Sequence, residues 1–368
     1  MNKITISATQ LYSLMILLLT GSTLIIGLNF TAKQDSVIAV IIELFIGILL
    51  FYFYLLILVK SSWKEFVPLL QMGFGTFIAR ILGVLYSLYF LYIAGLVVMD
   101  LSFLVTNIML LDSPNWVVVI PFLFVVGYSL ILGFEAIARS SEILMFIFII
   151  FLPIIWLLGF FSDEFDPKYL VPLFSEGWGS ISEVIFPIGL TFPFGELIVF
   201  LVLLPYVKNV KTVKKFSWLP ITISAFIIII TMELVIGILH APFASSFYYP
   251  FVKAIEMVSY LDMIEHFEVV LELLLLAGVF IKVTVYLYCA RVTLYQVFKI
   301  KKQNIWHIPL LLAFMYGGAL FKSTNMVEQL YLLREQVPYF LDIPFQLVIP
   351  FLLGLIIFGK TRGMKRKN

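Results

Sequence analysis

Long apolar stretches separated by short polar connections make up most of this chain. Windows of about 20 residues predict membrane-spanning helices, because a helix of that length crosses the hydrocarbon core of a bilayer. The expected spans are ten in number and lie near residues 10–29, 37–59, 81–106, 116–134, 143–161, 184–204, 218–239, 267–290, 305–321 and 343–359. The pattern therefore predicts an all-α integral membrane protein.

The distribution of basic residues predicts how these spans are oriented. Lys and Arg are retained on the cytoplasmic side of a membrane, so the side that holds most of them is expected to be the inner one. With the amino terminus inside, the cytoplasmic segments hold 18 of the 24 basic residues, namely Lys3, Lys60, Lys64, Arg80, Arg139, Lys208, Lys211, Lys214, Lys215, Arg291, Lys299, Lys301, Lys302, Lys360, Arg362, Lys365, Arg366 and Lys367. Both termini are thus expected in the cytoplasm.

Composition agrees with a membrane location and narrows the chemistry. Of the 368 residues, 62% are hydrophobic and 12% are charged, against about 25% charged in an average soluble protein. The single cysteine, Cys289, excludes an internal disulfide and a cysteine-ligated metal site. The chain has no HExxH, GxxxxGK[ST] or GxSxG motif. No enzyme activity, cofactor or metal is expected, and the net charge of +2 does not indicate nucleic-acid binding.

Ten spans divide into five and five, and an odd number per half places the second half in the opposite orientation. This is the organisation of an inverted repeat. We expect one transmembrane domain over 1–368, made of a first repeat (10–161), an outer connection (162–183), a second repeat (184–358) and a basic cytosolic tail (359–368).

The first span of each half carries an interruption. Thr20-Gly21-Ser22-Thr23 interrupts the first, and Thr191-Phe192-Pro193-Phe194-Gly195-Glu196 interrupts the sixth. Proline lacks a backbone donor, and an acid inside the bilayer is costly unless it faces protein or water. Paired interruptions of this kind mark the substrate site of many transporters. For Gly21 alone, close helix packing is an equally good explanation.

Further polar residues lie within or beside the spans. Asp100 shares a helix face with Tyr86 and Tyr89, either as a polar stripe along a cavity or as an anchor at the interface. Arg139 and Glu142, three residues apart, are expected to pair on a cytosolic helix that seals an inner gate, or simply to lie in a solvated loop. Other intramembrane acids are Glu43, Glu233 and Glu272.

Several segments together resemble the B-subunit family of bacterial spore germinant receptors, in the amino acid–polyamine–organocation transporter superfamily. They follow one another along nearly the whole chain: Gly133-Phe134-Glu135-Ala136-Ile137-Ala138-Arg139-Ser140-Ser141-Glu142, Leu170-Val171-Pro172-Leu173-Phe174-Ser175-Glu176-Gly177, Phe192-Pro193-Phe194-Gly195-Glu196, Tyr249-Pro250, Met263-Ile264-Glu265-His266-Phe267 and Phe280-Ile281-Lys282. Two departures affect the expected ligand more than the fold. The family's Glu-Arg reads Glu265-His266 here, and its Gly-x-Gly break reads Gly21-Ser22-Thr23.

The resemblance implies a LeuT-like 5+5 bundle with broken first and sixth helices, in the spore inner membrane. It also implies a complex with an A subunit and a lipoprotein C subunit that senses a nutrient, commonly an amino acid. The alternative is an amino-acid or organocation permease, coupled to protons through Glu196 or Lys282.

In a LeuT-like bundle the two interruptions face each other across a ligand. The expected ligand-binding residues are Gly21, Ser22, Thr23, Thr191, Pro193, Phe194, Gly195 and Glu196. Glu196 is expected either to contact a ligand amine or to accept backbone donors of the unwound segment. Lys282 is expected either to replace a bound metal cation near the first span, or to pair with a core acid. With Asp100, it completes the candidate ion-coupling residues.

Overall fold

The fold is described by a computed structural model, which describes residues 5–111, 113–174, 177–258, 268–300, 305–322 and 325–365. Within these ranges the chain is helical and has no strand, apart from an isolated bridge between Ile6 and Val207. The helices are α1 (Ala8–Gly21), α2 (Ser36–Lys60), α3 (Phe66–Phe74), α4 (Thr76–Leu104), α5 (Trp116–Leu132), α6 (Phe134–Phe160), α7 (Gly177–Val184), α8 (Phe200–Leu203), α9 (Val210–Phe216), α10 (Trp218–Leu239), α11 (Ala241–Ala244), α12 (Pro250–Met257), α13 (Glu268–Phe298), α14 (His307–Lys322), α15 (Met326–Tyr331) and α16 (Ile349–Lys365).

Short 3₁₀ or π segments join or extend these helices. They are η1 (Leu28–Asp35), η2 (Val105–Met109), η3 (Pro167–Leu170), η4 (Ile185–Gly189), η5 (Phe194–Val199), η6 (Leu204–Tyr206), η7 (Leu332–Gln336) and η8 (Pro338–Val348). Such segments break the regular helical hydrogen-bond ladder, and they often occur at functional positions. Here η4 and η5 lie within the expected sixth span, and η6 follows at its end after the short α8.

Each predicted span coincides with an apolar helical segment. Within the described residues, seven helices are long and apolar enough to cross a membrane. Three shorter apolar helices, Ala8–Gly21, Trp116–Leu132 and His307–Leu320, occupy the remaining predicted positions. The all-helical membrane class is confirmed, whereas the ten-span count and the inverted repeat stay predictions.

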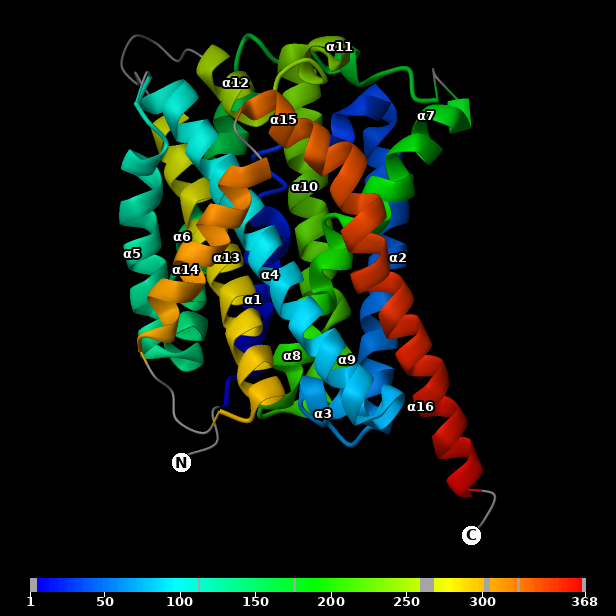
Figure 1. Ribbon diagram of the computed structural model, residues 1–368. Coiled ribbons are helices and arrows are strands. Elements are labelled where there is room, and N and C mark those ends of the chain that lie inside the picture. The colour runs from blue at the N-terminus through cyan, green and yellow to red at the C-terminus, as the bar shows by residue number, and fades with distance from the viewer. Residues whose placement is uncertain are drawn as a thin grey trace.

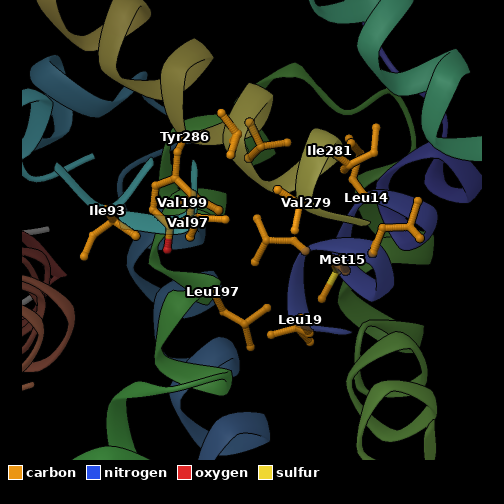
Figure 2. Packing of buried hydrophobic residues seen from close by; sticks show 14 of the residues in the cluster. Leu14, Met15, Leu19, Ile93, Val97, Leu197, Val199, Val279, Ile281 and Tyr286 are labelled. Atoms are coloured by element: carbon orange, nitrogen blue, oxygen red, sulfur yellow. The ribbon is translucent and has the colours of Figure 1, made fainter. Parts of the chain in front are cut away.

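Helix α13 lies at the centre of the bundle and packs against α4, α1 and α6 (Figure 1). Figure 2 shows apolar side chains of four elements meeting in this core, among them Leu14, Met15 and Leu19 of α1, Ile93 and Val97 of α4, Leu197 and Val199 of η5, and Val279, Ile281 and Tyr286 of α13. The core therefore joins both interrupted spans to α13 and α4. It fixes where polar side chains at the interruptions point.

Both predicted interruptions are present. Helix α1 ends at Gly21, and the chain then turns through residues 22–26 before η1 begins. The sixth span changes from α7 to η4, turns at residues 192–193 and continues as η5. The short helix α12 lies in the connection between α10 and α13. Glu265-His266, Ser175-Glu176 and the tail beyond residue 365 lie outside the described residues.

The start of the chain is fastened to the segment that follows the second interruption. Ile6 N–H donates to the Tyr206 carbonyl at 3.0 Å, and Lys208 N–H donates to the Ile6 carbonyl at 3.0 Å. The Tyr12 hydroxyl also donates to the Thr212 carbonyl of α9 at 3.2 Å. Because α1 starts and α16 ends at this same end of the bundle (Figure 1), we call it the terminal end and the opposite one the far end.

Candidate functional site

A buried ion pair connects the two interruptions. Lys282 of α13 directs its ammonium nitrogen to Glu196 Oε2 of η5, at 2.5 Å. The same nitrogen donates to Ser22 Oγ, just after the end of α1, also at 2.5 Å. One lysine thus contacts both broken segments, which lie 260 and 86 residues from it along the chain.

The surroundings of this pair are almost dry. Lys282 is 0% exposed and Glu196 is 4% exposed, and the Lys282 ammonium lies 4.9 Å from the ring centre of Phe192. A lone buried charge is strongly disfavoured, whereas a hydrogen-bonded opposite charge and an aromatic face offset much of the lost hydration. The two charges therefore depend on each other.

A small cavity opens beside the ion pair. Its volume is about 40 Å³, and its polar lining comes from Ser22, Asp100, Glu196, Lys282 and Asp342. Lys282 balances Glu196, so Asp100 and Asp342 contribute carboxyl groups beyond the pair. A cavity of this size holds a few water molecules, and a ligand group that replaced them would be correspondingly small.

Each additional carboxyl group has a defined partner. Asp342 Oδ1 accepts from the Tyr89 hydroxyl at 2.9 Å, and that hydroxyl accepts from Gln346 Nε2 at 2.8 Å. Asp100 Oδ1 accepts from Gln329 Nε2 at 2.6 Å. These contacts hold the carboxyl groups at the cavity wall, so that their remaining acceptor capacity is positioned before any ligand enters.

A second cavity adjoins the first. It has a volume of about 20 Å³ and a mainly apolar lining that includes Thr23, Phe30, Met232 and Phe251. Ile26 and Phe192 line both cavities. The first cavity is thus lined by charged groups and the second mainly by apolar ones, and the two share Ile26 and Phe192 in their walls.

The predicted ligand residues divide into those that line a cavity and those that shape the backbone. Ser22 and Glu196 line the charged cavity and Thr23 lines the apolar one. Thr191 instead donates to the carbonyls of Pro187 and Ile188, at 3.1 and 3.0 Å, so it closes a turn.

Three further predicted residues, Pro193, Phe194 and Gly195, line neither cavity. The Phe194 side chain packs against Gly47 of α2, and Gly195 lies against Gln346. They hold the interruption in place against α2 and η8. Their role as direct ligand contacts stays a prediction.

Gly21 serves helix packing. A Cβ atom built on it would come within 2.6 Å of the Gly278 carbonyl carbon, and neither cavity includes it. Of the two explanations left open for this glycine, the geometry favours the close approach of α1 to α13. That approach is what brings Ser22 within reach of Lys282.

Glu196 lines the charged cavity and its Oε2 atom accepts from Lys282, so its expected contact with a ligand amine stays a prediction. The expected pairing of Arg139 with Glu142 needs correction. No ion pair joins Arg139 to Glu142 among the described residues, although both lie on α6. Glu142 instead accepts from Thr9 Oγ1 at 2.9 Å and from Gln10 Nε2 at 3.2 Å, which occupies both its oxygens.

The sequence pattern does not identify Asp342, Gln346 and Gln329 as site residues. Phe192 lies in the second predicted interruption but is not among the predicted ligand-binding residues. Asp342 and Gln346 are four residues apart, so they share a helix face within an apolar segment. That spacing is a signal that could have identified them. Asp100 is 2% exposed and lines the cavity, so its place on a polar stripe is favoured over an interfacial anchor.

Replacing Gly21 by leucine is expected to force α1 away from α13. The added side chain meets backbone atoms of Gly278, which cannot rotate away, and overpacking of this kind typically costs about 1–3 kcal/mol. We expect reduced abundance of the protein in the membrane, measured by immunoblot. Gly317→Leu on α14 is the matched control, because nothing lies within 4 Å of a Cβ there. Equal abundance of the two variants would contradict the packing role.

Comparison with known proteins agrees with the resemblance carried by the motifs. A family model described as spore germination protein matches residues 5–326. Spore germination protein KB of Bacillus subtilis (strain 168) is 29% identical over 372 residues, covering 100% of this chain and 99% of the relative. Spore germination protein B2 of the same organism is 29% identical over 286 residues, covering 77% of this chain and 76% of that protein. Spore germination protein A2 is 27% identical over 216 residues, covering 59% and 58%. The chain therefore belongs to the family of spore germination proteins.

Proposed function

We propose that the chain is the B subunit of a spore germinant receptor, which binds a small nutrient in the cavity beside Lys282 and thereby triggers germination. The observation that carries the proposal is the junction of both interruptions at one ion pair, bordered by two more carboxyl groups. A spore germination protein with a transporter-like interruption pair has the parts of a small-molecule sensor.

The chemistry of the cavity supports a nutrient with an ammonium group. Asp100 and Asp342 add two carboxyl groups to the cavity wall, while Lys282 is already paired with Glu196. An amino acid would place its ammonium toward these carboxyl groups and a small apolar part beyond Phe192. A receptor complex with an A subunit and a lipoprotein C subunit, in the spore inner membrane, is part of the same proposal.

Two valines on α4 provide a test of the binding site. Val97 lines the charged cavity, whereas its neighbour Val98 does not, and both are at most 5% exposed. The nutrient is first identified as the one to which spores lacking the gene no longer respond. In spores that carry Val97→Leu we expect the nutrient concentration for half-maximal germination to rise about tenfold, because the added methylene occupies ligand space. Val98→Leu is the control.

The outcomes separate the proposal from its competitors. Unchanged sensitivity of Val97→Leu spores at normal abundance would remove the ligand from this cavity. Uptake of the labelled nutrient into vesicles, faster with the protein than without it, would instead favour a permease. A deletion strain with a complete germination response to every nutrient would contradict the receptor role itself.

A further inference from the structure

Glu272 of α13 is a buried acid that the nutrient cavity does not use. The residue is 4% exposed, and neither of its carboxylate oxygens has a hydrogen-bond partner among the described residues. Its acidic neighbours Glu268 and Glu256 add repulsion rather than balance. An acid at such a position indicates a function, because no hydrogen bond within the described part of the chain compensates its lost hydration.

This acid lies at the edge of a wide apolar groove. The groove has a volume of about 730 Å³ and runs between α5, α6 and α13, with η2 at one end. These three helices pack against one another, with α5 and α6 at the left of the bundle and α13 inward of them (Figure 1). Pockets of 300–1,000 Å³ are typical of small-molecule sites. No residue that lines this groove lines either cavity at the ion pair.

The groove is lined by one acidic residue and by many apolar side chains. Apart from Glu272 and Ser140, its described lining is apolar, including Leu273, Leu276 and Phe280 along α13. From Glu272 to Phe280 the helix rises about 12 Å. Glu272 lies one turn after Glu268, where the described part of α13 begins, and the apolar wall runs along α13 from the carboxylate.

We propose that this groove binds an apolar primary amine, with the ammonium on the Glu272 carboxylate and the hydrocarbon chain along α13. Charge complementarity selects the amine, since an ammonium group supplies the missing partner of Glu272. It also argues against a phospholipid, whose phosphate would need a cationic or donor-rich contact. The lining residues that the structure describes include no lysine, arginine or histidine, and Glu272 would repel a phosphate.

Binding of octylamine to the purified full chain tests the proposal. The protein is placed in nanodiscs of phosphatidylcholine, and the octylamine dissociation constant is measured from the rise in thermal unfolding temperature. We expect saturable binding that Glu272→Gln weakens at least tenfold, since the charged contact is lost. Glu268→Gln, one turn away on α13 and outside the groove lining, is the matched control and should bind as the unmodified protein does.

A second variant tests binding in the groove without changing Glu272. Ala277→Phe fills the groove while leaving Glu272 in place, and it too should abolish saturable binding. Octanol has the chain without the charge, and it should bind the unmodified protein and Glu272→Gln equally. Equal octylamine affinity in Glu272→Gln and the unmodified protein would overturn the proposal. So would stabilisation by phosphatidylethanolamine but not by octylamine, or failure of the unmodified protein to bind octylamine.

Discussion

Replacing Lys282 by methionine is expected to deplete the protein from the membrane and to abolish the nutrient response. Methionine fills the space of the lysine stem but leaves Glu196 buried without its partner. Loss of one member of a buried ion pair costs about 3–5 kcal/mol, a large part of the stability of an ordinary domain. Immunoblots of spore membranes and germination assays measure the two effects.

The double variant Lys282→Met, Glu196→Gln separates stability from function. Neutralising both residues removes the unpaired charge, and such replacements are often neutral or stabilising. We expect abundance to recover and the nutrient response to stay lost, because the charged junction of the interruptions is gone. Lys253→Met is the matched control, since Lys253 pairs with Glu256 at an exposed position and such pairs contribute roughly 0–1 kcal/mol. Normal nutrient sensitivity of Lys282→Met spores would contradict a role of the ion pair in both the stability of the protein and the nutrient response.

Replacing Asp342 by asparagine should lower sensitivity without removing the protein. Asparagine keeps an oxygen that can accept from Tyr89, but it no longer offers a charge to a ligand ammonium. A desolvated charged contact contributes about 1.5–3 kcal/mol, equivalent to roughly a ten- to hundredfold change in the effective nutrient concentration. Dose–response curves for germination by amine-bearing nutrients measure this shift.

Glu233→Gln is the control for this substitution. Glu233 is a half-buried acid of α10 that lines neither cavity, so loss of its charge should leave nutrient sensitivity unchanged. If Asp342→Asn spores respond as the parent does at equal abundance, Asp342 has no part in ligand recognition. If the protein is depleted from the membranes of Asp342→Asn spores, the hydrogen bond between Asp342 and Tyr89 mainly stabilises the fold.

The positions of the helices and of both interruptions could be predicted from the sequence, because they depend on local properties. Apolar runs of the right length indicate spans, and Pro193 with Gly195 indicates a break wherever the partners lie. Lys282 and Glu196 are each recognisable in the sequence as a charged residue within an apolar span, and each is therefore a candidate site residue. Their pairing could not be deduced, because several intramembrane acids were available and one sequence does not show which of them reaches α13.

Other parts of the site depend on tertiary contacts or on element boundaries. A glycine at position 21 is compatible in the sequence with contact to a ligand or to a neighbouring helix. The close approach of Gly278 on α13, seen only in the structure, favours the helix contact. The sequence pattern leaves Asp342 just outside the last predicted span, which begins near residue 343. The helical segment η8 instead begins at Pro338, which brings this acid inside the bundle. Errors of a few residues at an element boundary are usual, and here the boundary contained a site residue.

The attachment of Ile6 to residues 206–208 has a consequence for how a binding event is transmitted. Helix α1 is an uninterrupted rod of 14 residues, about 21 Å long, with Ser22 at one end and this attachment at the other. If nutrient binding displaces Ser22, α1 conveys the displacement to Val207 and, through Tyr12, to α9. Helix α9 carries Lys211, Lys214 and Lys215 at the terminal end. Information could therefore cross the membrane as a movement of α1 and be presented on a basic surface, without passage of a single solute molecule.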